Sequence, residues 1–378
     1  MPQTFRFTAF GEAMLRYIPD PGAEDAQGAT TRWLQSVGGA DLNVAVALAT
    51  LQGWSCTWIS AVPDNELGDV ILDAVNMAVD GLPMKKAMMH HSEMYQHVLY
   101  ALLIPAEVDV SHVKRAPGEV GIYHVWPQQK RMVYQRRHSV FCTMADAMFS
   151  DEFWHGYWQG LYRDVFHVTG ITMQLSDCCR RAQHAAIRCA LDKGVFVSLD
   201  LNWRPALGPF ADLFAEVKPW VSLVDVVVIS TDQLGELGKA ISCELDSAEA
   251  LDTAIQVSLV SVCEELRAKT LCICCKFAQK QGQLRWSVVA STNSGPGESE
   301  GGPPRVSVVS SFSRAVSQQP LEALGGGDAW VAGFLDARIL NDTSLSDAAH
   351  QADTLAALCQ DRVGDFSTVT RHELLAGL

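Results

Sequence analysis

The chain has 378 residues, 48% of them hydrophobic and 19% charged, which allows about two domains or one large α/β domain with a substantial core. Its net charge of −14 argues against general binding to nucleic acid or anionic membranes, because such surfaces attract basic faces. The 11 cysteines are scattered along a long chain, a layout that favours reduced, buried thiols over a disulfide framework. No secretion signal or membrane span is recognisable, so we expect a cytoplasmic protein.

Strand-like and helix-like segments alternate along most of the chain, starting with a strand at 5–10 and a helix at 40–51. Further strands are expected at 55–62, 165–169, 195–200, 224–230, 271–277 and 286–290. Further helices are expected at 67–77, 177–193, 328–340 and 347–359. This alternation predicts an α/β fold, with a mostly parallel sheet and helices on both faces.

Three kinds of segment interrupt this alternation. Residues 12–37 and 119–137 are strand-rich without helices, which suits a small antiparallel sheet acting either as a lid or as an edge extension. Residues 291–304 are rich in Ser, Gly, Glu and Pro and read as a flexible loop. A Met-rich segment holds His90, His91 and His97, and an insert facing solvent or a partner fits it better than a metal site.

The most informative motif is the run Gly325-Gly326-Gly327-Asp328, directly before a small and apolar helix pattern. Glycine backbones and a helix N-terminus together offer amide hydrogens that suit a phosphate. Asp328 at this position suits a general base that takes a proton from an attacking hydroxyl. An ordinary glycine turn with an aspartate cap explains the same residues about equally well.

Two further motifs place polar groups at the ends of elements. Gly38 and Gly39 precede a helix that carries Asp41 and Asn43 in its first turn, which suits either a polyol site or an ordinary helix start. After the strand at 195–200, Asn202 and Arg204 lie at alternate positions, where open α/β sheets bind ligands. A salt-bridged strand end is the competing interpretation.

Tyr123, Tyr134 and Arg136 fall in the strand-rich region, and alternation puts Tyr134 and Arg136 on one face. They point at a substrate if this sheet is a lid, and otherwise lie at the surface. The Cys272–Cys275 spacing occurs once, inside a strand-like run, so zinc or redox chemistry is the minority hypothesis there. A Walker A motif is absent from the sequence, which disfavours a P-loop enzyme.

These residues together resemble the ribokinase-like (PfkB) carbohydrate kinases, and within them the 2-dehydro-3-deoxygluconate kinases. The glycine–aspartate signature is strong for the superfamily, and the similarity covers most of the chain. The segments that carry it are Gly11-Glu12 with Arg16, Gly38 to Ala45, Val62 to Gly68, Val108 to Val113, Gly121 to Tyr123, Tyr134 to Ser139, Thr169 to Thr172, Asp200 to Arg204, Gly325 to Gly333, and Gly364 to Phe366.

The resemblance implies one Rossmann-like kinase domain over 1–378 with a β lid, often dimeric or a higher homo-oligomer through that lid. It implies transfer of the ATP γ-phosphate to a sugar hydroxyl with Mg²⁺, and leaves open a need for a monovalent cation. By matching position, Asp328 is the base and Gly325, Gly326 and Gly327 form the anion hole. The sugar acid is assigned to Gly38, Gly39, Asn43, Tyr123, Tyr134, Arg136, Arg204 and Asp365, and the nucleotide to Asn202, Arg204, Lys276, Gly282, Gly325 and Gly327.

The sequence also departs from the family pattern. The usual Asn-x-x-Glu segment, which helps to organise Mg²⁺, reads Ser230 to Gln233, so we expect Asp232 or Glu236 to substitute for the lost acid. Residues 77–103 look like an insertion, of regulatory, oligomeric or poorly structured character. Three hypotheses follow: a kinase for 2-dehydro-3-deoxygluconate, a related kinase for a fructose-like sugar or a nucleoside, or a non-catalytic binding protein.

Overall fold

The computed structural model describes residues 5–20, 32–76, 107–129, 131–143, 146–158, 164–238, 247–279, 282–292, 306–311, 314–316 and 324–378. The predicted insertion at 77–103, with His90, His91 and His97, lies outside these residues. So does most of the loop predicted at 291–304, of which only its first two residues are described.

Within the described residues, ten strands form one large sheet in the order β15-β14-β13-β12-β11-β10-β1-β4-β6, with β16 beside β14. Neighbouring strands are parallel from β6 to β13, whereas β14 is antiparallel to β13, β15 and β16. The strands are β1 (Phe5–Phe10), β4 (Trp54–Ile59), β6 (Val108–Asp109), β10 (Asp164–Thr169), β11 (Phe196–Asp200), β12 (Val226–Ser230), β13 (Thr270–Gln279), β14 (Gly282–Ser291), β15 (Ser307–Ser310) and β16 (Arg314–Val316).

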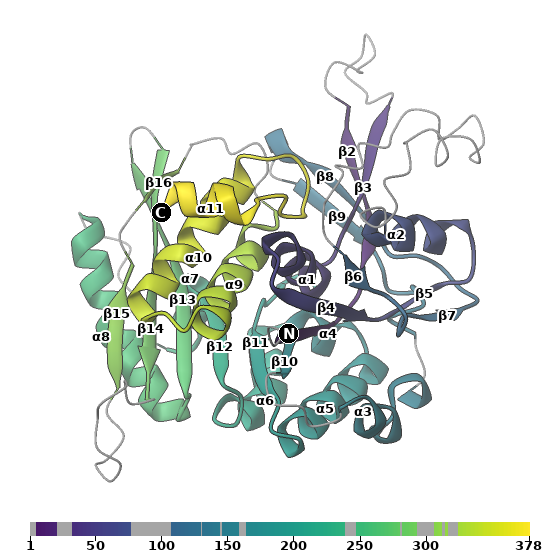
Figure 1. Cartoon of the computed structure of the whole chain (residues 1–378), viewed down its shortest axis with the longest axis horizontal. Coiled ribbons are helices and arrows are strands. Elements are labelled where there is room, and N and C mark those ends of the chain that lie inside the picture. Colours follow the sequence, from purple (N-terminus) through teal and green to yellow (C-terminus); the bar gives the residue numbers. More distant parts are fainter. Residues whose placement is uncertain are drawn as a thin grey trace.

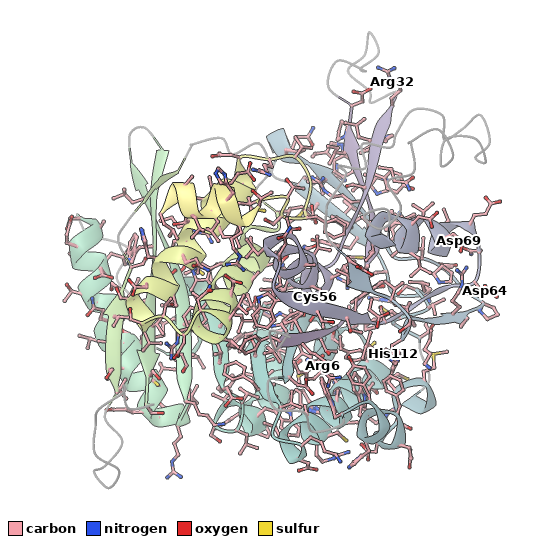
Figure 2. All side chains as sticks on the ribbon, viewed as in Figure 1. Arg6, Arg32, Cys56, Asp64, Asp69 and His112 are labelled. Carbon is pink, nitrogen blue, oxygen red and sulfur yellow. The ribbon has the colours of Figure 1, made fainter. Side chains whose placement is uncertain are left out.

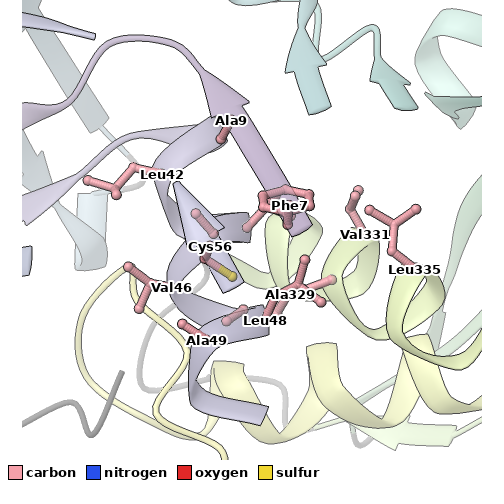
Figure 3. Close-up of a cluster of buried hydrophobic side chains, with 14 of the residues drawn as sticks. Phe7, Ala9, Leu42, Val46, Leu48, Ala49, Cys56, Ala329, Val331 and Leu335 are labelled. Carbon is pink, nitrogen blue, oxygen red and sulfur yellow. The ribbon is translucent and has the colours of Figure 1, made fainter. Parts of the chain in front are cut away.

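Helices cover both faces of this sheet, each over its own hydrophobic core (Figure 1). One core includes side chains of α1 (Ala40–Leu51), α2 (Glu66–Asn76), α9 (Gly326–Leu335), α10 (Leu345–Gln360) and α11 (Arg371–Gly377). Figure 3 shows its centre, where Phe7 and Cys56 of the sheet face Leu48 of α1 and Ala329 of α9. The opposite core includes α3 (Asp151–Tyr157), α5 (Asp177–Asp192), α6 (Phe210–Val221) and α8 (Ala248–Leu266). Strand residues alternate between the two cores because successive side chains of a strand point to opposite faces.

A second sheet stands beside the first, at the upper right of Figure 1. Its order is β3-β2-β8-β9, from β2 (Met14–Pro19), β3 (Trp33–Gly38), β8 (Ile122–Trp126) and β9 (Arg131–Gln135). These strands overlap the segments 12–37 and 119–137, but the sheet is mixed and not antiparallel as predicted, because β2 pairs with β8 in parallel. Its action as a lid stays a prediction. A two-stranded sheet joins β5 (Ala61–Pro63) to β7 (Lys114–Ala116).

The predicted fold class is confirmed, since the mostly parallel sheet carries helices on both faces. Two predicted elements are wrong in detail. The strand expected at 55–62 is divided, because β4 pairs with β1 whereas β5 turns away to pair with β7. The helix expected at 328–340 begins two residues earlier at Gly326, and becomes the π-helical turn η5 (Asp336–Leu340). The sequence analysis also missed α3, α6, α8, α11, and the short helices α4 (Gly170–Leu175) and α7 (Thr231–Glu236).

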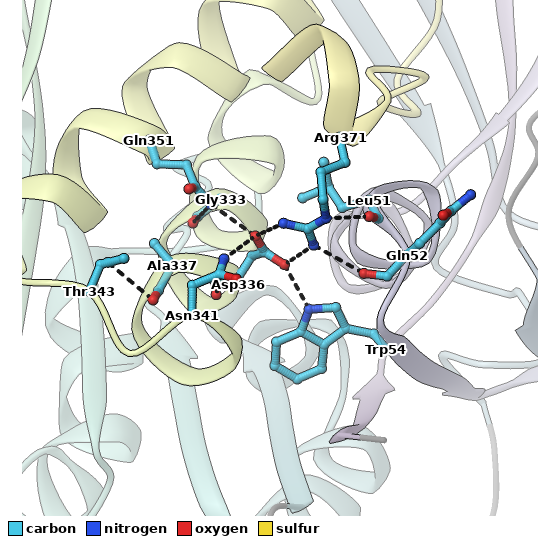
Figure 4. A network of polar contacts seen from close by, with 10 residues as sticks. All are labelled: Leu51, Gln52, Trp54, Gly333, Asp336, Ala337, Asn341, Thr343, Gln351 and Arg371. Atoms are coloured by element: carbon cyan, nitrogen blue, oxygen red, sulfur yellow. Dashed lines mark hydrogen bonds and ion pairs between the residues drawn. The ribbon is translucent and has the colours of Figure 1, made fainter. Parts of the chain in front are cut away.

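A buried carboxylate joins the last helix to the middle of the fold (Figure 4). Asp336 is fully buried and forms a two-pronged ion pair with Arg371 of α11, at 2.6 and 2.9 Å. The indole of Trp54 and the amide of Gln351 also donate to it, at 3.0 and 2.9 Å. Arg371 donates further to the carbonyl of Leu51 at the end of α1, so this network holds α1, α9, α10 and α11 together.

The motif Pro63-Asp64-Asn65-Glu66-Leu67-Gly68 acts as the start of α2. Asn65 accepts from the amide of Leu67 at 3.0 Å, as a capping side chain does. Arg115 of β7 binds Asp64 at 3.1 Å and Asp69 at 2.5 Å, and Figure 2 shows these two carboxylates at the margin of the molecule. The motif therefore fixes α2 to the small sheet. In the described part of the chain, no helix is both long and apolar enough to span a bilayer.

Candidate active site

A cavity of about 960 Å³ is lined by the second sheet, the start of α1, the loop after β11 and the start of α9. Its volume lies within the range of small-molecule sites. The lining includes every residue that the sequence assigned to the sugar acid: Gly38, Gly39, Asn43, Tyr123, Tyr134, Arg136, Arg204 and Asp365. Gly325 and Asp328 also line it. The fold thus brings these residues together from segments more than 300 positions apart.

Asp328 lies in the first turn of α9 and is only 8% exposed. Its Oδ2 accepts a 2.6 Å hydrogen bond from the side-chain amide of Asn43, in the first turn of α1. Burial raises the pKa of the Asp328 carboxyl, while the Asn43 bond and the positive charge of Arg204 oppose that rise. A raised pKa brings a carboxylate nearer to the range in which it can accept a proton usefully.

The glycine run forms the N-terminus of α9, and its members differ in what surrounds them. Gly325 precedes the helix with φ +74°, and a Cβ there would lie 2.1 Å from the carbonyl oxygen of Asp365. A Cβ on Gly327 would meet nothing within 4 Å. The first amide hydrogens of a helix lack partners within the helix. Packing therefore requires a glycine at Gly325, whereas the space beside Gly327 is open.

Asp365 is held between two groups of the second sheet. Its Oδ1 forms a 3.1 Å ion pair with Arg16, and the hydroxyl of Tyr123 donates to its Oδ2. All three side chains are buried. Tyr123 stacks in turn on Tyr134, with the ring centroids 5.6 Å apart, and Tyr134 is 37% exposed. This wall of the cavity offers an aromatic face backed by a neutralised aspartate.

Arg136 is engaged within the protein. Its Nε donates to Oε2 of Glu12 at 2.7 Å, and the hydroxyl of Ser139 donates to the other oxygen of Glu12. Glu12 and Arg136 have side chains that are only 2% and 9% exposed. Arg136 lines the cavity, as the sequence predicted, but its charge is already balanced.

Arg204 follows β11, is exposed and lines the same cavity. Within the described residues its guanidinium has no carboxylate in ion-pair contact. Nearby, Asp200 accepts a 2.9 Å hydrogen bond from the amide of Asn202, whose φ of +41° is unusual for a residue other than glycine. Burial, followed by the charge of Asp328, raises the pKa of Asp200 to about 7. Burial also raises the pKa of Asp41, which accepts a hydrogen bond from the hydroxyl of Thr169 at 3.1 Å.

Comparison with known proteins supports the sequence interpretation. No family model matches the chain. Over 206 residues it is 30% identical to a 2-dehydro-3-deoxygluconokinase of Thermoproteus tenax, covering 52% of this chain and 51% of that one. Over 385 residues it is 24% identical to a 2-dehydro-3-deoxygalactonokinase of Haloferax volcanii, covering 98% and 96%. The chain thus spans about half the length of the first relative and nearly all of the second.

The fold matches the crystal structure of a 2-dehydro-3-deoxygluconokinase from Thermotoga maritima, with a TM-score of 0.73, 22% identity and 98% of both chains covered. It also matches a fructokinase from Vibrio cholerae with fructose, ADP and a calcium ion bound, with a TM-score of 0.64, 21% identity and 99% of both chains covered. The chain has the PfkB carbohydrate kinase fold. The predicted resemblance to this family is confirmed in sequence and in fold.

Several residues that were predicted to bind the nucleotide or a metal are not found in the lining of the cavity of this PfkB fold. Asn202, Gly326 and Gly327 do not line the cavity, whereas the surroundings of Gly282 and the side chain of Lys276 lie outside the described part of the structure. Asp232 and Glu236 are exposed on α7, and the described residues include no group of three or more His, Cys, Asp or Glu that could hold a metal. We therefore assign no metal ligand, and these roles stay predictions.

The segment Ser230 to Gln233 has a structural explanation in this PfkB fold. Ser230 accepts from the amide of Gln233 at 3.3 Å, and Gln233 accepts from the amide of Ser230 at 3.0 Å. This reciprocal pair caps α7. Similarly, Cys272 and Cys275 are free and buried, with burial raising the pKa of both thiols, so neither resembles a thiolate metal ligand.

Several polar residues of the cavity wall were not assigned to a ligand from the sequence, among them Glu12, Gln174 and Arg137, whereas Asp41, which the sequence placed beside Asn43, also lines the cavity. Glu12 stands inside a segment that carried the family resemblance, so its motif position was a usable signal. Arg137 follows Arg136 directly, and strict strand alternation assigned it to the other face. The strand β9 ends at Gln135, and a turn follows in which the amide of Ser139 donates to the carbonyl of Arg136 at 3.0 Å. Alternation therefore does not apply to Arg137.

Proposed function

We propose that this chain is an ATP-dependent sugar kinase that transfers the γ-phosphate to a hydroxyl of a sugar acid. The expected substrate is 2-dehydro-3-deoxy-D-gluconate and the expected product is its 6-phosphate. The observation that carries this proposal is Asp328, buried at the N-terminus of α9, in one cavity with the exposed Arg204. A base, an anion-binding helix start and a cation for an acidic substrate are thereby combined.

In the proposed reaction the sugar hydroxyl oxygen attacks the γ-phosphorus of ATP, and the bond from that phosphorus to the bridging oxygen of ADP breaks. The hydroxyl proton passes to the Asp328 carboxylate, and Asn43 holds that carboxylate in place through the 2.6 Å bond. The first amide hydrogens of α9, which have no partner within the helix, offset negative charge on the transferred group. When bound, Mg²⁺ supplies further charge neutralisation on the phosphates.

Arg204 and the Tyr123–Tyr134 pair support the assignment of an acidic, polyhydroxylated substrate. Tyr134 leaves part of its ring exposed to the cavity, where it can pack on the carbon chain of a sugar. Arg204 supplies a cation in a protein whose net charge is −14. A relative that acts on this acid and a structural neighbour of the same name agree with this choice.

The test is an acceptor panel with purified protein, ATP and Mg²⁺, in which ADP release and the phosphorylated product are both followed. We expect kcat/KM to be highest for 2-dehydro-3-deoxy-D-gluconate, compared with its galactonate epimer, fructose and a nucleoside. A preference for fructose or the nucleoside would contradict the acid assignment. Absence of transfer to every acceptor would contradict the kinase proposal and favour a non-catalytic binding protein.

A further inference from the structure

A buried arginine of β14 lies against the start of α9, outside the cavity. Arg285 is 3% exposed and is not among the residues that line the cavity. Its Nη2 donates to the carbonyl oxygen of Gly326 at 3.5 Å, and its Nη1 donates to Oε1 of Gln360 at 3.4 Å. Gly326 is the first residue of α9 and Gln360 is the last residue of α10. Arg285 therefore joins β14 to one end of each of these helices.

The charge of Arg285 is balanced by Asp353 of α10. Oδ1 of Asp353 lies 3.8 Å from Nε of Arg285 and accepts from the hydroxyl of Ser287 at 2.7 Å. The hydroxyl of Ser311 donates to Oδ2 of Asp353, and the indole of Trp330 on α9 donates to Ser287 at 2.6 Å. All five side chains are buried. A buried ion pair often gives a fold no more stability than apolar residues of the same volume, so stability is a weak reason for a cation here.

The bond from Arg285 to Gly326 acts on the peptide unit that carries the amide hydrogen of Gly327. This unit is planar and trans, so its carbonyl and its amide hydrogen point in opposite directions. A donor at the carbonyl polarises the unit and makes its amide hydrogen a stronger donor. A charged guanidinium does this more strongly than a neutral group. The amide of Gly327 is among the first of α9, which have no partner within the helix.

We propose that Arg285 is a positioning residue for the nucleotide, which fixes the first peptide unit of α9 and strengthens its amide hydrogen as a donor to the γ-phosphate of ATP. Arg285 itself does not contact the phosphate. This inference rests on the proposed function, because it concerns the phosphate side of the same reaction. Arg204 and Tyr134 line the cavity whereas Arg285 does not, so binding of the sugar acid should not depend on Arg285.

The test removes both buried charges at once, in the double variant Arg285→Met/Asp353→Asn. Neither charge is then left without its partner, and an asparagine at 353 can still bond with the hydroxyls of Ser287 and Ser311. We therefore expect a melting temperature close to that of wild type. Arg285→Met alone should melt at a lower temperature, because it leaves the Asp353 carboxylate buried without a cation.

Nucleotide binding is measured by calorimetry with Mg²⁺ and without sugar, for ATP and for ADP, which differ by the γ-phosphate. In the double variant we expect Kd for ATP to rise about 10-fold, less than the 10²- to 10³-fold loss typical when such a donor is removed outright. Kd for ADP and Kd for the sugar acid should change little. A general distortion of the nucleotide site would weaken ATP and ADP alike.

Two further variants separate the charge of Arg285 from the packing around it. Asp353→Asn alone keeps the arginine and should bind ATP as wild type does. Arg285→Lys keeps a charge but lacks the fork that reaches both Gly326 and Gln360, so its ratio of Kd for ATP to Kd for ADP should be intermediate. Wild-type ATP binding by the double variant, or an equal loss for ATP and ADP, would overturn the inference. If the double variant does not fold, a wild-type ratio in Arg285→Lys would overturn it.

The same measurements separate this inference from the kinase proposal. If wild type binds ATP but phosphorylates no sugar, the proposed function fails, and the inference still predicts the selective loss of ATP affinity. If the double variant binds ATP and ADP as wild type does while wild type phosphorylates the sugar acid, the inference fails alone. Absence of ATP binding by wild type would overturn both.

Discussion

The side-chain amide of Asn43 donates to the carboxylate of Asp328 across 2.6 Å, although 284 residues separate the two in the chain. The bond joins the first turns of α1 and α9, the two helices whose starts meet at the cavity. Asn43 also accepts from the amide of Gly39 at 3.2 Å, which fixes the orientation of its side chain. The proposed base is therefore held by a group that is itself held in place.

Removing this amide should alter the pH dependence of the reaction. The Asn43 bond lowers the pKa of Asp328, so in Asn43→Ala that pKa rises further. Because a base must be ionised to accept a proton, the acidic limb of the kcat/KM profile should move to higher pH and activity at neutral pH should fall. Asn43→Asp should move it further, because a second carboxylate would repel the charge of Asp328. An acidic limb at the same pH in wild type and both variants would contradict the role of this bond.

The raised pKa of Asp200 should make the free energy of unfolding depend on pH. That pKa is about 7 in the folded protein, whereas the ordinary value of an aspartate is 3.8, so the folded state binds more protons between these two values. Stability from this group therefore falls as pH rises from about 4 to about 7, and is lowest above 7. Asp200→Asn should raise the free energy of unfolding by roughly 2–4 kcal/mol at pH 8. The gain should shrink as pH falls toward 4, and urea titrations at several pH values measure it. A pH-independent difference would contradict the raised pKa.

The glycines Gly325 and Gly327 have different roles at the start of α9. Packing requires a glycine at position 325, whereas Gly327 has open space beside it. Gly325→Ala should destabilise the fold by about 1–3 kcal/mol, because of the positive φ and the contact with the Asp365 carbonyl. Gly327→Ala should keep or slightly raise the melting temperature, since its methyl group meets open space and alanine favours a helix. Its turnover should fall roughly 10²-fold or more, because the methyl group stands beside the amide hydrogens that are proposed to offset charge on the transferred group. Full turnover by a well-folded Gly327→Ala would contradict that role of the start of α9.

The network around Asp336 makes a prediction about stability alone. Arg371→Met leaves a fully buried carboxylate without its cation, so the free energy of unfolding should fall by about 3–5 kcal/mol. The control is Arg362→Met, in the turn after α10, which removes a 2.6 Å pair with Glu373, whose side chain is 44% exposed, and two hydrogen bonds to Thr368. It should change stability by only about 1 kcal/mol. Similar losses for the two variants in chemical denaturation would show that the network does not hold the helices as described.

The sequence predicted best those elements whose hydrophobic residues follow one clear period and whose ends are marked by a glycine. The strand at 5–10 and the helix at 40–51 coincide with β1 and α1, since glycines at Gly11 and Gly39 delimit them. The helix α8 was missed although Ser247 caps it, because its apolar side chains do not form a single clean stripe. The division between β4 and β5 depends on pairing with distant strands, and local sequence does not contain that information.

The cavity shows the same contrast. Motif positions brought Asp328, Asn43, Tyr134 and Arg204 into one prediction, and the fold brings them into one cavity. The pairing of Arg136 with Glu12 was not predictable, because it depends on how the β1–β2 connection packs against the end of β9. Charge balance among buried side chains is a property of the folded structure, and a list of cations in the sequence does not reveal it.

Phosphoryl transfer by the Asp328→Asn variant tests the central claim most directly. Single-turnover transfer from ATP to 2-dehydro-3-deoxy-D-gluconate, with acid binding measured in parallel, separates loss of the base from loss of the site. We expect acid binding close to that of wild type and a transfer rate lower by about 10²- to 10⁴-fold. Equal transfer rates in wild type and Asp328→Asn would contradict the assignment of Asp328 as the base.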